Sequence, residues 1–311
     1  MMPVDLTHGV ETWHATSQCA HNDNVSLWRK RRHWNRLFVT SAILIIGLAG
    51  VLPAQQTTTT TTQRTSPPQA KTQKEFADYN AAYATTGGAA VEKAADSFAA
   101  AYPQSELRSY LYAKAMHEYQ NENNSDKMLA MGNKVIGLDP DNSVALVLTA
   151  TLLADSLADS KDETLEKDRA QKIAAIQKNA THALDAVDGS FTPPQNATPE
   201  QIAAYKSTLR SMARSALGIM ELKNGNDAQA EKDLQEAASL NKVAPDPYIW
   251  YHLALAQDHQ RKYAEALASI NQALQCTASN PDLEKLAKGE RQRLVDLAGS
   301  APESPQKPPR Q

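Results

Sequence analysis

The chain has 311 residues, carries a net charge of -3 and contains only 6% aromatic residues. A mildly acidic surface of mixed sign lacks the basic footprint that a phosphate backbone requires, so we expect no nucleic-acid partner. The many alanines of the chain favour helices that pack closely through small side chains.

Basic residues at positions 29–32 and 36 precede an apolar run over residues 37–52, which leads into Pro53 and Ala54. Such a pattern is typical of a secretory signal, and the run is shorter than the roughly 20 residues of a transmembrane helix. We expect residues 29–54 to be a signal peptide cleaved after Ala54, with a retained membrane anchor as the alternative. In either case the rest of the chain is exported across the inner membrane of a bacterium, and is periplasmic or tethered facing the periplasm.

The flanking segments lack the pattern of a folded core. Residues 1–28 read as an irregular extension, and translation starting at Val25 or Leu27 is one hypothesis for it. Residues 55–72, rich in Thr and Pro, are expected to be a solvated linker, and residues 301–311 a disordered tail. Because export would separate Cys19 from Cys276, we predict no disulfide between them and a buried, inert thiol at Cys276.

Two stretches of the central region repeat one spacing. The first has Leu217, Gly218, Gly225, Ala230, Leu234 and Ala237; the second, thirty-six residues later, has Leu253, Ala254, Arg261, Ala266, Ile270 and Ala273. Small residues at fixed offsets let two helix axes approach within about 8–10 Å. A period of this length predicts stacked helical hairpins, each with a turn between its helices.

At these positions the chain resembles the tetratricopeptide repeat (TPR) family. The family's unit has an aromatic residue at position 4, Leu-Gly at 7 and 8, Tyr at 11, Ala at 20 and 27, and Pro at 32. The unit that begins at Pro247 fits best and carries Trp250, but it has Gln257 at position 11 and Arg261 in place of the turn glycine. The other clear unit begins at Ser211.

Weaker units precede these two. One begins at Ser109 with Tyr112 and Tyr119 at positions 4 and 11, and an earlier one contains Phe98 and ends near residues 101–105. For the upstream units a generic helical bundle is the alternative, because amphipathic helices also repeat apolar residues at three and four.

A fifth unit is expected between these groups. It begins at Ser143, is interrupted by a polar insert over residues 156–168 and resumes near Ile176. A loop over residues 188–200 then leads to a long helix that begins near Gln201.

The resemblance implies an all-α fold, a right-handed superhelical stack of antiparallel helix pairs over residues 73–300. A helix over residues 282–299, with Leu283, Leu286, Leu294 and Leu297 on one face, is expected to cap the C-terminal end. The residues expected to pack the repeats together are Leu217, Gly218, Ala230, Ala237, Trp250, Leu253, Ala254, Ala266 and Ala273.

No arrangement of residues predicts catalysis, a metal site or a cofactor. His252 and His259 are seven residues apart, too far for a shared metal without a third ligand, and the usual pair at i and i+4 is missing. The sequence has no Gly-rich phosphate loop and no Gly-x-Ser-x-Gly elbow. We therefore expect a protein that is not an enzyme.

The TPR resemblance implies that the first helix of each unit lines a concave groove. Its expected partner-binding residues are Tyr110, His117, Met212, Ile219, Tyr248, Tyr251, Leu255 and His259. Tyr and Met in a groove suit an extended or helical peptide, although several of these tyrosines could instead pack against the next repeat. The Lys/Asn clamp that grips a chaperone's C-terminus is absent, since position 5 is Ala113, Ser215 and Tyr251.

These patterns favour a non-enzymatic protein–protein interaction scaffold of the cell envelope, which binds an unknown protein or peptide. The alternative is a self-associating structural or accessory subunit of an envelope or secretion assembly, with a homo-oligomer as its state. Membrane contact is expected only through residues 29–54, if they are uncleaved. Repeat architecture identifies a fold without naming its partner.

Overall fold

A computed structural model describes residues 68–157, 166–190, 197–242, 245–277 and 280–300. Within this part of the chain all regular secondary structure is helical, which confirms the predicted all-α class. The helices are α1 (Gln73–Tyr83), α2 (Gly88–Ala101), α3 (Arg108–Asn121), α4 (Ser125–Leu138), α5 (Ser143–Ser156), α6 (Glu166–Ser190), α7 (Pro199–Lys223), α8 (Asp227–Leu240), α9 (Pro247–His259), α10 (Tyr263–Gln275) and α11 (Pro281–Ser300).

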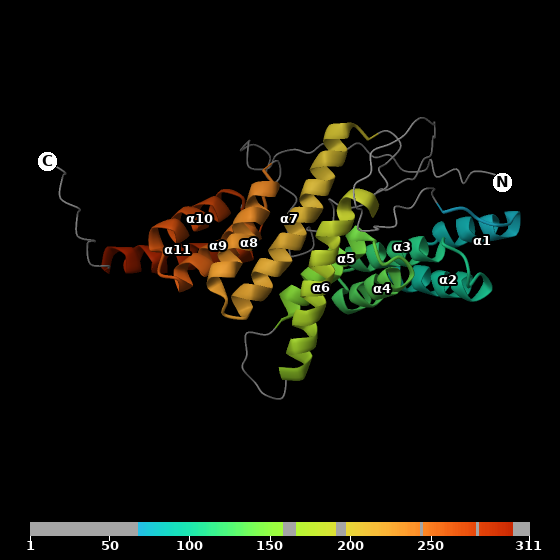
Figure 1. The fold of residues 1–311 in the computed structure, drawn as a ribbon, viewed down its shortest axis with the longest axis horizontal. Coiled ribbons are helices and arrows are strands. Elements are labelled where there is room, and N and C mark those ends of the chain that lie inside the picture. The colour runs from blue at the N-terminus through green and yellow to red at the C-terminus, as the bar shows by residue number, and fades with distance from the viewer. Residues whose placement is uncertain (1–67, 158–165, 191–196, 243–244, 278–279, 301–311) are drawn as a thin grey trace, which may run out of the picture.

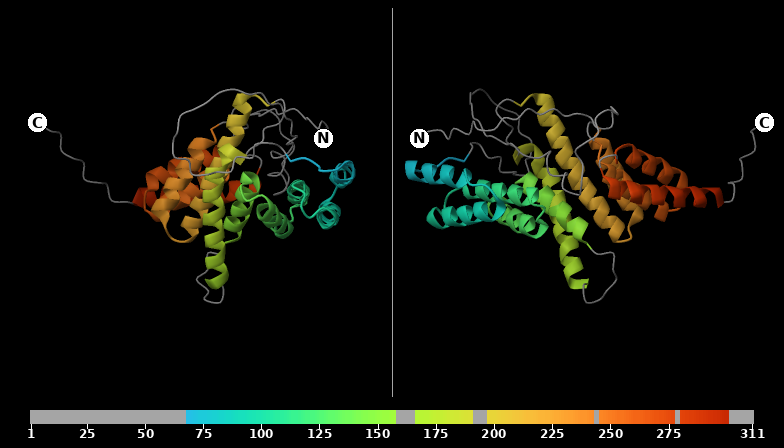
Figure 2. Two further views of the ribbon diagram at one scale, coloured as in Figure 1. Left: turned by 45° about the vertical axis from the view of Figure 1, so that its right-hand side comes forward. Right: turned by 180° about the vertical axis from the view of Figure 1, so that it is seen from behind.

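Each helix packs against the next one along the chain, so that α1 to α10 form five consecutive pairs and α11 packs on α10. The pairs are arranged as an elongated array with α1 at one end and α11 at the other (Figure 1). The two long helices α6 and α7, of 25 residues each, cross the middle of this array steeply. Both project beyond their neighbours, α7 to one side and α6 to the other (Figure 2).

A left-handed backbone residue stands at the same place in four of the five pairs. Gly87, Asn123, Gly225 and Arg261 have φ angles of 85°, 56°, 80° and 59°, and each lies in the turn between the first and the second helix of its pair. The spacing is thirty-six residues from Gly87 to Asn123 and again from Gly225 to Arg261. A left-handed conformation costs a non-glycine residue about 1–2 kcal/mol, so the turn geometry is maintained at Arg261 despite its side chain.

Three apolar clusters follow one another through the array. One joins α1 to α5 around Leu111 and Val135, a second joins α5 to α9 around Leu234, and a third joins α9 to α11 around Ile270. Met212 contacts the first two clusters, and Trp250 contacts the second and the third. The core is therefore continuous from end to end, as a stack of hairpins requires, since no single hairpin can bury both of its faces.

Helix bounds in the middle of the chain differ from those predicted. The polar insert is shorter than expected, because α5 continues to Ser156 and α6 already begins at Glu166. The following loop is also shorter, since α6 runs to Ser190 and α7 begins at Pro199. Thr198 caps α7 through a capping box with Gln201, and this signal sets the start of the helix before the residue predicted.

Two side-chain predictions near the C-terminus are wrong. In α11, Leu283 and Leu294 are buried, but Leu286 is 56% exposed, because Ala287 occupies the buried stripe instead. Cys276 is half-buried rather than fully buried. The prediction that no disulfide joins Cys276 to Cys19 stays a prediction, because Cys19 lies outside the described residues.

None of the helices in the described part of the chain combines the length and the apolar character needed to cross a bilayer. The apolar run over residues 37–52, for which a signal or an anchor was predicted, lies outside that part.

Candidate partner-binding face

The eight predicted partner-binding residues lie on the first helices of three pairs, α3, α7 and α9. On each helix they are spaced by three, four or seven residues, so that they form one stripe along it. We call these three stripes together the first-helix face. The three stripes differ in how much of their side-chain surface is buried against other helices of the array.

The stripe on α9 keeps part of its apolar surface. Tyr248, Tyr251 and Leu255 are half-buried, and His259 is exposed. The Tyr251 ring meets the His252 ring edge-on, with centroids 5.6 Å apart, and burial raises the pKa of Tyr251. Tyr248 is held at its tip, because the Asn280 side-chain amide donates a hydrogen bond of 2.7 Å to its hydroxyl.

The stripe on α3 has the same mixed character. Tyr110 and His117 are half-buried, and burial lowers the pKa of His117, which favours a neutral imidazole at pH 7. Beside them, the Lys114 ammonium lies 5.2 Å from the ring centroid of Tyr83 and 3.1 Å from the carboxylate of Glu118. Tyr83 is 39% exposed, so the aromatic surface here extends onto α1, beyond the residues predicted from the sequence.

The stripe on α7 packs against other parts of the array. Ile219 is only 5% exposed and belongs to the central core, and Met212 packs against two core clusters. The reason is that α5 packs directly along α7. Lys223 also points into this contact, where its ammonium donates hydrogen bonds of 2.9–3.1 Å to the carbonyls of Ala154, Asp155 and Leu157 at the end of α5. Ile219 therefore does not fit the predicted partner contact, and the stripe is interrupted at α7.

The residues predicted to pack the repeats are placed at the helix contacts. Gly218, Ala230, Ala237, Leu253, Ala254, Ala266 and Ala273 are buried, Leu217 is 9% exposed and Trp250 is half-buried. Gln257, which departs from the family's Tyr, is also buried and spans two neighbours: its amide donates to Glu231, and its carbonyl oxygen accepts from Ser269.

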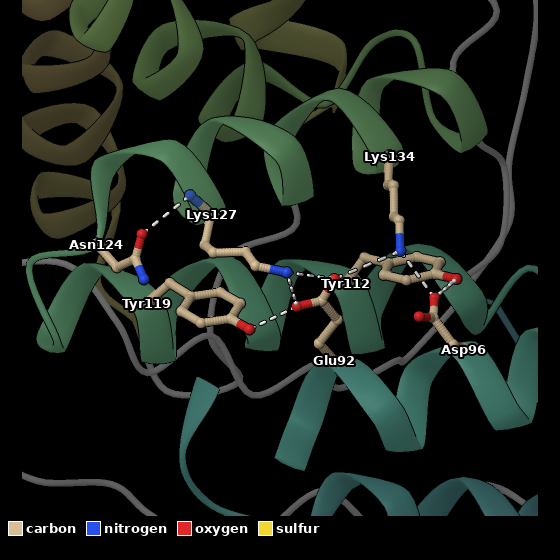
Figure 3. A network of polar contacts seen from close by, with 7 residues as sticks. All are labelled: Glu92, Asp96, Tyr112, Tyr119, Asn124, Lys127 and Lys134. Atoms are coloured by element: carbon tan, nitrogen blue, oxygen red, sulfur yellow. Dashed lines mark hydrogen bonds and ion pairs between the residues drawn. The ribbon is translucent and has the colours of Figure 1, made fainter. Parts of the chain in front are cut away.

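Sequence reasoning missed a polar network across α2, α3 and α4 (Figure 3). The hydroxyls of Tyr112 and Tyr119 donate to Asp96 and Glu92 on α2, and Lys134 and Lys127 on α4 pair with the same two carboxylates. Lys134 also lies 4.6 Å from the centroid of the Tyr112 ring. The sequence predicts Tyr112 and Tyr119 only as repeat-forming aromatics; their seven-residue spacing, matched by Lys127 and Lys134, is the available signal for the network.

No group of three or more His, Cys, Asp or Glu side chains that could hold a metal ion occurs within the described ranges. Two histidines instead pair singly with carboxylates. His259 Nδ1 lies 2.8 Å from Asp227, and His182 Nε2 lies 2.7 Å from Asp141. Each pair joins two different parts of the helix stack.

Comparison with known proteins gives few similarities. No protein-family model matches the chain, and no curated protein matches it. Among solved structures it is similar to TTC0263, a thermophilic TPR protein in Thermus thermophilus, with 14% identity and a TM-score of 0.42, over 70% of this chain and 98% of that one. It is also similar to the MamA protein, with 16% identity and a TM-score of 0.34, over 61% and 88% of the two chains. These similarities are too low to carry an argument; the paired helices and their repeated left-handed turns show an all-α array of stacked helix pairs in the described part of the chain.

Proposed function

We propose that the protein is a non-enzymatic scaffold that binds a partner protein or peptide at the α9 and α3 stripes of the first-helix face. The observation that carries this proposal is the half-burial of Tyr110, Tyr251 and Leu255. Each is anchored by the core on one side and leaves apolar surface for a partner on the other. Tyrosine offers a large contact area at low entropic cost, together with a hydroxyl for hydrogen bonding.

Site-specific photo-cross-linking in intact cells tests this proposal. A photoreactive residue at position 251 or 110 is expected to give a partner adduct. The same residue at position 286 is the matched control, because Leu286 is an exposed apolar residue on α11, outside the face. Adducts at all three positions, or at position 286 alone, would contradict the proposal. An adduct of twice the chain's mass would instead identify the self-associating subunit.

We further propose that the helix array is exported and acts in the cell envelope. The support is the basic segment at 29–36 followed by the apolar run over residues 37–52. N-terminal sequencing of the protein isolated from cells is expected to begin at Gln55, as cleavage after Ala54 requires. A mature protein that retains residues 29–54 would favour the membrane anchor, and recovery of this longer form in the soluble cytoplasmic fraction would refute export.

A further inference from the structure

Glu92 on α2 joins three helices at the first border between pairs (Figure 3). It accepts a hydrogen bond from the Tyr119 hydroxyl on α3 and pairs at 3.0 Å with the Lys127 ammonium on α4. The Lys134 ammonium, which pairs with Asp96, lies 3.9 Å from the Glu92 carboxylate. Glu92 is thus held by the first and the second helix of the following pair.

Glu231 on α8 has the same arrangement at the other end of the array. It accepts hydrogen bonds from the side-chain amides of Gln257 and Gln260, at the end of α9, and pairs with the Lys262 ammonium at the start of α10. The Gln235 amide on α8 adds a bond of 3.2 Å. Here too a carboxylate on the second helix of one pair contacts both helices of the next.

The two glutamates are each the fifth residue of the second helix of their pair, although Glu92 lies five residues after the left-handed Gly87 and Glu231 six residues after the left-handed Gly225. Glu92 and Glu231 each follow directly a fully buried residue of the second helix, Val91 and Ala230. Their partners on the following first helix, Tyr119 and Gln257, both occupy position 11 of units that begin at Ser109 and Pro247. The position that departs from the family at Gln257 therefore keeps its contact with the preceding pair.

Both carboxylates are shielded from water, with side chains 17% and 12% exposed. The hydrogen bond from Tyr119 lowers the pKa of Glu92, with Lys127 adding to it. Burial opposes ionisation of Glu231, but the hydrogen bonds from Lys262, Gln260 and Gln257 outweigh it and lower its pKa. Charge-assisted bonds in such a place are stronger than exposed surface ion pairs.

We infer that Glu92 and Glu231 are inter-pair clamps, which couple the helix pair at each end of the array to its neighbour and prevent it from opening on its own. In a stack of pairs, stability is shared between the pairs and their borders. Loss of a border contact should therefore act locally: on α1 and α2 for Glu92, and on α9 to α11 for Glu231.

Hydrogen exchange of the full-length chain, resolved by helix, tests the clamps. Glu92→Gln is expected to speed amide exchange in α1 and α2 about tenfold and to leave α8 to α11 unchanged. Glu231→Gln is expected to show the reverse pattern. The matched controls are Glu106→Gln, an exposed position, and Glu284→Gln, whose carboxylate pairs with Lys288 of the same helix, α11.

Tyr119→Phe provides a second variant that removes one hydroxyl and keeps the ring. It is expected to speed exchange in the same helices as Glu92→Gln, by about threefold, because one of the clamp's bonds is lost. A rise spread evenly along the chain in the Glu92 and Glu231 variants would show general destabilisation and overturn the inference. A rise no larger than that of the controls would overturn it as well.

Discussion

Replacing Gly218 with valine is expected to lower the free energy of unfolding by about 3 kcal/mol, because α7 and α8 leave no room for a side chain there. A Cβ atom at Gly218 would lie 2.6 Å from Cγ of Leu234 and 3.2 Å from its backbone nitrogen. Leu234 is fully buried and cannot move aside into solvent. The next pair has Ala254 at the equivalent position, where a fully buried Cβ atom is accommodated between the helices.

Chemical denaturation of the variants measures this effect. Gly137→Val is the matched control, since a Cβ at this exposed position of α4 meets nothing within 4 Å, and it should change stability by less than about 0.5 kcal/mol. Leu234→Ala alone should cost about 2–5 kcal/mol. Combined with Gly218→Val it should cost less than the sum of the two, because the valine fills space that the leucine leaves. Additive losses would show that the two residues do not meet.

The helix pairs α7–α8 and α9–α10 could be predicted from the sequence, because close contact between their helices restricts which residue types fit. Only small side chains fit at Gly218, Ala254 and Ala266, and their spacing reports the hairpins directly. The sequence predicts the turn position at Gly225 and Arg261 but not at Gly87 or Asn123. Asparagine tolerates the left-handed conformation and is common elsewhere, so it gives a weaker signal than glycine.

The middle of the array could not be predicted in the same way. Both α6 and α7 exceed the ordinary repeat helix, and nothing in the residues of α7 alone indicates that α5 will cover its stripe. Ile219 has the pattern of a groove residue and the burial of a core residue, because its burial depends on a helix that is distant in the chain. Lys223 likewise finds its carbonyl partners on that other helix.

The polar contacts between helix pairs could not be predicted from the sequence either. Glu92 and Glu231 are ordinary helix residues in the sequence, and their partners lie 26 to 35 residues further along the chain. Their resemblance becomes visible only from the contacts that each makes with both helices of the following pair. A carboxylate next to a buried small or branched residue on a second helix is a pattern worth seeking in other arrays.

Replacing both Tyr110 and Tyr251, half-buried tyrosines of the α3 and α9 stripes, with alanine is expected to abolish most of the affinity for the partner identified by cross-linking. Tyr110→Ala and Tyr251→Ala should each weaken binding by about 2 kcal/mol, or roughly thirtyfold, as aromatic residues at the centre of an interface do. The matched control removes Leu286 and Val295, the exposed apolar residues of α11, and should bind as the unaltered chain does. Thermal unfolding of each variant confirms that the helix array remains folded.

The most direct measurement of the central claim is a binding titration with the partner identified by cross-linking. It compares three forms of the full-length protein: the unaltered chain, the double tyrosine variant, and the α11 variant that lacks the Leu286 and Val295 side chains. The predicted result is a dissociation constant raised roughly nine-hundredfold in the double tyrosine variant, as two additive losses of about 2 kcal/mol give, and unchanged in the α11 variant. Equal affinity in all three folded forms would contradict the assignment of the first-helix face as the binding surface.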